Sequence, residues 1–364
     1  MSVFVDNGYR TRLGVSFYDR VAELGNLEEL TGSYRLVVVY GPRNVGKSEL
    51  VYYWGRRRHR HRFVAIQSDL LRASERVEGV ARYLVAPGDE IRESILGALR
   101  SRLRDLGLLG LVYAAYDTVR SLLGETIFFI DEFHLLPRYA GRRAGLEEAL
   151  VDLEALAHSL AKAEEPRLRV VLAVSEGFFA SQEALTRLHG YSTEHLLVEH
   201  MDEKSYRALY TEYAEGKGCS TDFATIYGVA GGAPGYLAEL CSSQQAVERL
   251  IERSESLLEW SLAEAREALG LGAREAIELS YRLLGGESLA PLEQPRLHRL
   301  GQLLVLHNIA YPVQEASGMR YKPQLPIYRV LLEIAAEEKQ ATLLGISAEK
   351  ALGRAREQVE TNKA

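Results

Sequence analysis

The chain has 364 residues, of which 47% are hydrophobic and 26% are charged, and its formal net charge is -6 at pH 7. A chain of this length and composition is expected to form two or three globular domains. The negative charge argues against a generally basic protein that coats nucleic acid, and no apolar run is long enough to span a membrane. Cys219 and Cys241 are the only cysteines, too few for a disulfide framework or a cysteine-rich zinc site. Because the first residues also lack the apolar segment of a secretion signal, the sequence predicts a cytoplasmic protein.

The first strong signal lies in residues 35–58. The run RLVVVY predicts a buried strand, GPRNVGKS (41–48) follows it, and SELVYYWGRR has helix-forming character. This segment matches the pattern GxxxxGK[ST], in which backbone N–H groups surround the phosphates of a nucleotide. We expect Lys47 to reach the β- and γ-phosphates as a catalytic residue, and Ser48 to supply an oxygen ligand to Mg²⁺. The residues predicted to contact the nucleotide here are Gly41, Pro42, Arg43, Asn44, Val45, Gly46, Lys47, Ser48 and Glu49.

Basic side chains crowd the end of this first helix. The run GRRRHRHR (55–62) suits phosphate contacts on DNA or RNA. A solvated connector whose cations lie favourably at a helix C-terminus explains it as well, and we favour that interpretation. HRFVAIQSD (61–69) then predicts a second strand, and residues 88–122 have helical periodicity.

TIFFIDEFHLL, residues 126–136, places an acidic pair after a continuous apolar run. Such a run predicts a central parallel strand covered on both faces, and doubly wound sheets bind their ligands at the carboxyl ends of such strands. We expect Asp131 to hold Mg²⁺ through water and Glu132 to be the base that orients the attacking water. An acidic pair after a strand is by itself usually only a polar loop, so this interpretation depends on the phosphate-binding segment upstream.

Two more strands complete a predicted five-stranded parallel sheet with helices on both faces. They are RLRVVLAVSEG (167–177) and HLLVEH (195–200). Ser175 is a candidate catalytic contact for the γ-phosphate or the lytic water, although a serine that caps the next turn is an equally good interpretation. The sequence thus predicts an α/β P-loop domain over residues 1–200.

Beyond residue 200 the pattern changes to helices. MDEKSYRALYTEYAEGKG (201–218) has an acidic start suited to a helix N-terminus, and it opens a predicted helical lid over residues 201–250. Amphipathic helices, and the pair AYPVQ and MRYKP around EASG, predict a winged-helix domain over 251–335, followed by a C-terminal helix and tail over 336–364. Basic residues that could contact nucleic acid on that domain are Arg296, Arg299, Arg320 and Lys322. Acidic residues slightly outnumber basic ones there, so docking of a protein partner or self-association is the competing interpretation, and the favoured one.

Four segments resemble, in order, motifs of the archaeal ATPase branch of the STAND and AAA+ P-loop NTPases. They are FYDRVAELGNLEEL (17–30), VVVYGPRNVGKSEL (37–50), FFIDEFHLL (128–136) and GVAGGAPGYL (228–237). The resemblance implies that Phe17, Tyr18 and Arg20 lie near the adenine and that Pro234 packs close to the base or ribose. From the residues alone, the last segment is only a flexible break between two helices. Many relatives carry an arginine before the fifth strand; none follows His189–Gly190 here, and Arg187 is the candidate substitute.

Taken together, these features predict an ATPase that binds ATP and Mg²⁺ and works as a conformational switch acting through its winged-helix domain. The alternative is an ATP-dependent remodeller or initiator that binds DNA or RNA. A nucleotide-binding scaffold without turnover is a third, weaker hypothesis.

Overall fold

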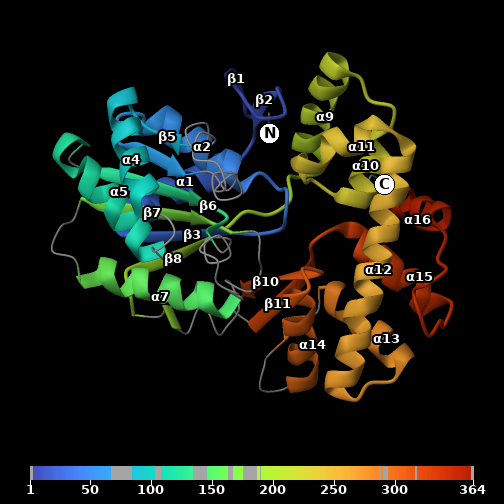
Figure 1. Ribbon diagram of the computed structural model, residues 1–364. Helices are drawn as coiled ribbons and strands as arrows, with labels where there is room; N and C mark the ends of the chain where they lie inside the picture. Colours follow the sequence, from blue (N-terminus) through green and yellow to red (C-terminus); the bar gives the residue numbers. More distant parts are fainter. Residues whose placement is uncertain are drawn as a thin grey trace.

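The computed structural model has two halves that lie side by side, an α/β core on the left of Figure 1 and a largely helical half on the right. The structure describes residues 3–66, 84–102, 108–123, 125–133, 146–162, 167–174, 187–188, 190–286, 288–289, 294–315 and 318–361. Ser175 and His189 therefore lie outside the described residues.

A six-stranded sheet forms the centre of the core, with the strand order β5-β4-β6-β7-β3-β8. Its members are β3 (Leu36–Tyr40), β4 (Phe63–Ile66), β5 (Leu84–Val85), β6 (Thr126–Asp131), β7 (Leu168–Ala173) and β8 (Thr193–Leu197). All five predicted strands are present, and they run parallel to their neighbours. The predicted count of five is wrong, because β5 adds an antiparallel edge strand beside β4. At two residues, β5 is too short to show a periodicity in the sequence.

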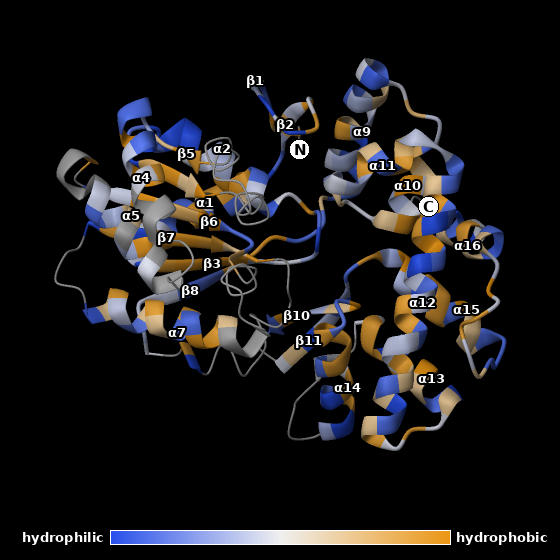
Figure 2. Ribbon diagram, viewed as in Figure 1, coloured by the Kyte–Doolittle hydropathy of each residue, from blue (hydrophilic) through white to orange (hydrophobic). Residues whose placement is uncertain are grey.

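Alternating residues of the central strands build two hydrophobic layers. Val38 faces α4 (Asp89–Arg102), α5 (Leu108–Leu123) and α7 (Leu146–Lys162), whereas Val37 and Val39 face α1 (Val21–Ser33) and α2 (Lys47–Arg58). The predicted helices on both faces are thus confirmed, and the strands are coloured as hydrophobic in Figure 2. None of the described helices combines the length and the apolar character that a membrane crossing requires.

A small hairpin precedes the core. Strands β1 (Val5–Arg10) and β2 (Ser16–Tyr18) pair antiparallel, with an irregular register between Asp6 and Arg10. The hairpin lies between the core and α9 at the top of Figure 1. It was not predicted, because exposed and buried residues do not alternate along β1.

The helical half begins with the segment predicted as a lid. Asp202 caps α9 (Glu203–Lys217) by accepting a hydrogen bond of 2.8 Å from the backbone N–H of Ser205, which confirms the predicted helix start. Four further elements follow in sequence, and they are α10 (Phe223–Ala230), the short 3₁₀ helix η4 (Pro234–Tyr236), α11 (Leu237–Ser242) and α12 (Gln244–Leu269).

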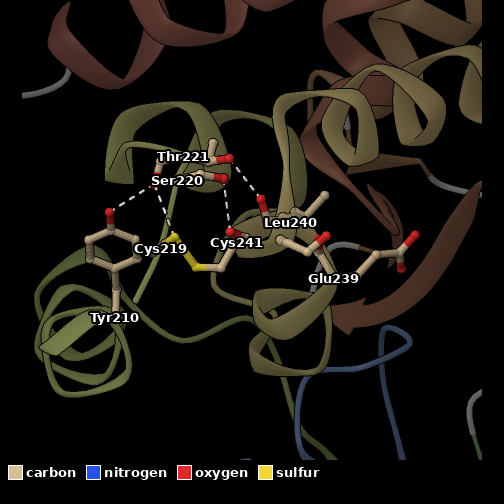
Figure 3. The surroundings of a disulfide bond; sticks show 8 residues. Tyr210, Cys219, Ser220, Thr221, Glu239, Leu240 and Cys241 are labelled. Atoms are coloured by element: carbon tan, nitrogen blue, oxygen red, sulfur yellow. Dashed lines mark hydrogen bonds between the residues drawn. A yellow bond between two sulfur atoms is a disulfide. The ribbon is translucent and has the colours of Figure 1, made fainter. Parts of the chain in front are cut away.

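A disulfide joins Cys219 to Cys241 within this part, as Figure 3 shows. The hydroxyl of Ser220 donates to the carbonyl oxygen of Cys241 at 3.0 Å, and that of Thr221 donates to the carbonyl oxygen of Leu240 at 2.8 Å. The bond ties the loop between α9 and α10 to α11. The two cysteines were expected to be too few for a disulfide framework; the structure nevertheless pairs them across 22 residues, and sequence spacing alone does not reveal such a contact.

The chain ends with a helical unit that carries a small sheet. Its elements are α13 (Ala273–Leu284), β9 (Ser288–Leu289), α14 (Pro295–Leu306), β10 (Ala310–Glu315), β11 (Gly318–Pro323), α15 (Pro326–Glu337) and α16 (Ala348–Thr361). The predicted hairpin is confirmed, with Ala310 opposite Pro323, and β9 adds a third strand beside β11. One hydrophobic cluster runs from Met201 to Ala355, across the predicted boundaries at 250 and 335, which stay predictions.

Candidate functional site

The loop between β3 and α2 adopts a conformation that its sequence explains. Gly41 has φ 142° and Gly46 has φ 96°, a region that side chains disfavour. A Cβ atom on Gly41 would lie 2.1 Å from the carbonyl oxygen of Val198, so only glycine fits at this close approach. Gly46 precedes the first turn of α2, whose free backbone N–H groups attract anions.

Lys47 lies inside the loop that precedes it. The side chain is buried, and its ammonium group donates to the carbonyl oxygens of Gly41 at 3.0 Å and of Pro42 at 2.6 Å. A buried lysine keeps its charge only with such partners. An anion bound at the start of α2 would therefore meet a cation that the loop already holds in place.

Ser48 and Asp131 are brought together from different elements. The Ser48 hydroxyl donates a hydrogen bond of 2.6 Å to the Asp131 carboxylate at the end of β6. Burial, followed by the neighbouring Glu132 carboxylate, raises the pKa of Asp131 to about 6, and the bond from Ser48 opposes that rise. Glu132 itself has φ 51°, a conformation that non-glycine residues rarely adopt and that is often found at functional positions.

A cavity of about 320 Å³ lies over these groups, a size suited to a small ligand. Most of the residues predicted to bind the nucleotide line it, and these are Phe17, Tyr18, Arg20, Asn44, Val45, Gly46, Lys47, Ser48, Glu49, Glu132 and Pro234. The lining does not include Gly41, Pro42, Arg43 or Asp131. Gly41 and Pro42 accept hydrogen bonds from Lys47, and Asp131 accepts one from Ser48. Within the described chain, Arg187 does not line this cavity.

The aromatic and basic residues at the far end of the cavity have defined partners. The ring of Phe17 stacks on Tyr53 with a centroid distance of 3.9 Å, and the hydroxyl of Tyr18 donates to Glu212 at 2.7 Å. Arg20 is buried, and its guanidinium donates to the carbonyl oxygen of Val45 at 2.9 Å. Arg20 thus helps to hold the phosphate-binding loop in shape.

Several lining residues were missed by the sequence analysis. Thr11, Arg12, Leu13 and Ser16 come from the β1–β2 hairpin, and Met201 and Leu209 come from the segment around α9. The Arg12 guanidinium lies 5.0 Å from the ring centroid of Tyr52, close enough to Asp131 for its charge to oppose the raised pKa of that carboxyl. No local sequence pattern predicts these contacts, because each depends on a distant segment that folds back over the phosphate-binding loop.

The segment GGAPG (231–235) packs tightly against the phosphate-binding loop. The N–H of Gly235 donates to the carbonyl oxygen of Asn44 at 2.9 Å, and the N–H of Met201 donates to that of Gly232 at 2.9 Å. A Cβ atom on Gly232 would lie 1.9 Å from the carbonyl oxygen of Met201. The glycines therefore permit close backbone contact, and the interpretation of this segment as only a flexible break is wrong.

Comparison with known proteins places this geometry in a family. The model of a family described as an ATPase domain predominantly from Archaea matches residues 17–240, more than half of the chain. The chain belongs to this archaeal ATPase family. The predicted resemblance is thereby confirmed. The match begins at the first residue of the first motif and ends at residue 240, just after the last motif.

A solved structure of an archaeal protein shares the fold of this archaeal ATPase. The Walker-type ATPase PABY2304 of Pyrococcus abyssi is similar, with a TM-score of 0.52 and 22% identity over 87% of this chain and 96% of that one. Weaker matches are Aeropyrum pernix ORC2 (TM-score 0.38, 11% identity, 98% and 97% covered) and A. pernix ORC1 in complex with DNA (0.40, 17%, 88% and 92%). A comparison with curated proteins finds no match.

The donor atoms of this archaeal ATPase suit Mg²⁺. The Ser48 hydroxyl and the Asp131 carboxylate are hard oxygen ligands on one side of the cavity, directly beside the first turn of α2. Mg²⁺ usually binds through one or two protein oxygens, waters and the phosphates of a ligand, rather than in an all-protein cage. Two protein oxygens beside an anion-binding helix start match that requirement.

The core and the helical half of the ATPase meet along a polar seam, which we define by Arg43, Glu199, His200, Lys322 and Gln324. The buried Gln324 side chain accepts a hydrogen bond of 2.9 Å from the backbone N–H of Arg43, inside the phosphate-binding loop. The imidazole of His200 donates from Nε2 to the carbonyl oxygen of Gln324 at 3.1 Å. Burial lowers the pKa of His200 to about 4, so the ring is neutral at pH 7. Lys322 forms an ion pair with Glu199.

The basic residues proposed for nucleic-acid contact all have partners within the chain. Arg320 pairs with Glu315 at 3.4 Å, and Lys322 is part of the seam. Arg296 donates to the carbonyl oxygen of Leu269 at 3.0 Å, and Arg299 donates to Gln302 at 3.2 Å. In this arrangement the hairpin β10–β11 faces the core rather than presenting a free basic surface.

Proposed function

We propose that this archaeal ATPase is an ATP-hydrolysing conformational switch, in which the nucleotide site and the C-terminal unit are linked through the seam. One observation carries the proposal. Gln324, from the segment after β11, is bonded to the backbone of Arg43 in the loop that would hold the phosphates. A change in that loop on nucleotide binding or hydrolysis would alter a contact on which the docking of the C-terminal unit depends.

The roles at the site follow from its geometry. Backbone N–H groups at the start of α2 would bind the phosphates, and Lys47 would exchange its bonds to Gly41 and Pro42 for phosphate oxygens. Ser48 and Asp131 would hold Mg²⁺, which when bound supplies charge stabilisation for phosphoryl transfer. Glu132, at the cavity wall, would accept a proton from the attacking water, while Phe17, Tyr18 and Pro234 would enclose the base and ribose.

The C-terminal unit fits a winged-helix domain of the kind that STAND-type switches carry. Helices α13 and α14 precede a β10–β11 hairpin, the order expected of helices followed by a wing. The alternative, a remodeller that grips DNA or RNA with this unit, has less support, because the basic residues of the hairpin are paired with Glu315 and Glu199.

Substitution Glu132→Gln tests the assignment. It should leave ATP affinity within about threefold and lower kcat by at least ~10²-fold, since a general base contributes about that much. Glu278→Gln, an exposed change on α13, is the matched control for contaminating activity and should retain full turnover. Isothermal calorimetry and phosphate release measure the two quantities; loss of ATP binding together with turnover would count against the role of Glu132.

A further inference from the structure

A second cavity, of about 710 Å³, lies away from the nucleotide site. It is bounded by β1, by the C-terminal end of α2 and by the segment from β5 to the start of α4. Among the residues that the structure describes, five arginines line it, against a single acidic residue, Asp89. We call this cavity the arginine groove, and its arginines are Arg10, Arg56, Arg57, Arg60 and Arg92.

Two of these arginines have no carboxylate partner in the part of the chain that the structure describes. Arg57 is paired with Asp6 and Arg10 with Glu212, whereas Arg56 and Arg60 form no ion pair there. Arg56 only lies near the ring of Tyr52, with its guanidinium 5.7 Å from the centroid. Both side chains are exposed, so their positive charges are available to an anion.

Compensation of the helix dipole does not account for the groove. Cations interact favourably with the C-terminal end of a helix, and Arg58 lies in the last turn of α2, where it also pairs with Glu28. Arg10 and Arg92, however, reach the same cavity from β1 and α4. Three separate elements thus bring cations to one concave surface, in a protein whose overall charge is negative.

The lining favours a phosphate backbone over a protein surface. The large exposed hydrophobic side chains of the described chain lie elsewhere, at Phe4, Val5, Val21, Val151, Trp260, Leu306 and Leu344. A protein interface normally has an apolar core, whereas backbone phosphates require only cations, which arginine supplies in a geometry that matches phosphate oxygens. Two aromatic residues are in the described lining, Tyr9 and Phe63. Phe63 is buried, and Tyr9 packs edge-on against Phe17 and Tyr53, so neither ring is free to stack on a base.

We propose that the arginine groove binds the sugar–phosphate backbone of a nucleic acid, without reading its sequence. A concave surface suits a rod-like polymer better than a flat membrane surface, and we expect Arg56 and Arg60 to contribute most. The β1–β2 hairpin is a shared wall, since Tyr9 and Arg10 line the groove while Arg12 and Leu13 line the nucleotide cavity. The proposal concerns binding alone and does not depend on the ATPase role.

Fluorescence anisotropy with a labelled 20-base-pair DNA duplex, measured without nucleotide between 50 and 200 mM salt, tests the proposal. The parent protein should bind, with an affinity that falls with salt, and Arg56→Glu combined with Arg60→Glu should lower the affinity at least ~10-fold and reduce the salt slope by about 2. The same pair changed to glutamine should give an intermediate loss, which guards against damage by the introduced charge.

The matched control is Arg249→Glu with Arg274→Glu, which changes the net charge equally on exposed positions of α12 and α13. It should bind DNA like the parent. The proposal is overturned if the parent does not bind at 50 mM salt, if the control loses as much affinity as the groove variant, or if only Arg320→Glu with Lys322→Glu weakens binding. Competition by poly-glutamate at the same charge concentration as DNA would also overturn it, in favour of an acidic protein partner.

Discussion

The contacts inside each half of the molecule differ from the contacts between the two halves. Most buried hydrophobic side chains of each half belong to clusters within that half, although Ala233 of the helical half packs into a core cluster and Val15 of the N-terminal hairpin packs into the helical one. The seam between them consists of named polar contacts, chiefly those of Glu199, His200 and Gln324. Hydrophobic burial resists rearrangement because its cost grows with exposed area, whereas a few hydrogen bonds can exchange partners at little net cost. We therefore expect the seam to be the place at which the two halves rearrange if the proposed switch operates.

The largest expected effect is on the pH dependence of stability, and it sets a titrating group of the core, Asp131, against one of the seam, His200. Asp131 has a folded-state pKa raised from 3.8 to about 6, so its contribution to stability is present below pH 3.8 and is lost as the pH rises through 6. His200 has a pKa lowered from 6.5 to about 4, so its contribution is present above pH 6.5 and is lost as the pH falls through 4. Between pH 4 and 6 the contributions of Asp131 and His200 to the free energy of unfolding change with pH in opposite directions. Over its full titration range, each contribution amounts to about 3 kcal/mol.

Single substitutions should separate the contributions of Asp131 and His200 to the pH dependence of stability. Asp131→Asn should raise the free energy of unfolding at pH 7 by about 3 kcal/mol. Without the opposing titration of Asp131, the loss of stability caused by protonation of His200 as the pH falls should become visible. His200→Gln should instead give a protein that gains stability, relative to the parent, as the pH falls from 6.5 to 4. Urea unfolding of the parent and the two variants at several pH values measures these changes in stability. The other carboxylates titrate alike in all three proteins, so the differences between the profiles report Asp131 and His200. Parallel profiles for the two variants would contradict the assignment.

Smaller effects are expected from the seam itself. Gln324→Ala leaves the Arg43 N–H without its buried acceptor and should cost about 1–2 kcal/mol of stability, whereas Lys322→Gln removes a partly exposed ion pair and should cost less than about 0.5 kcal/mol. Gln314→Ala, on the exposed side of the same hairpin, is the control and should change nothing. Hydrogen exchange should increase at residues 41–46 in Gln324→Ala alone. The reverse order of effects would show that the ion pair, rather than the glutamine, holds the seam.

Local patterns were sufficient for most of the core. The apolar runs before Gly41 and Asp131 predicted their strands, and the spacing of Gly41, Gly46 and Lys47 predicted the loop between them. The edge strand β5 was missed because two residues carry no periodicity. The disulfide was missed because pairing of Cys219 with Cys241 depends on how α10 and α11 pack, and the spacing of the cysteines does not reveal it.

The phosphate end of the site was predictable from local motifs. For the rest of the cavity, the family resemblance supplied Phe17, Tyr18, Arg20 and Pro234, but not the residues of the hairpin and α9. Lys47, Ser48 and Asp131 belong to short motifs whose strand and helix context fixes their positions. Arg12 and Leu209 reach the cavity only because the hairpin and α9 fold over it, and Gln324 reaches Arg43 across 281 residues. Contacts of that kind are set by tertiary packing, which no periodicity of a single segment encodes.

The most direct test of the switch is the distance between the two halves with and without nucleotide. Spin labels at Glu29→Cys on α1 and Glu278→Cys on α13 report it by pulsed electron resonance, with the native disulfide left intact. The account predicts that a slowly hydrolysed ATP analogue with Mg²⁺ shifts the distance distribution in the parent and leaves it unchanged in Lys47→Ala. Identical distributions in the parent, with the analogue shown to be bound, would contradict it.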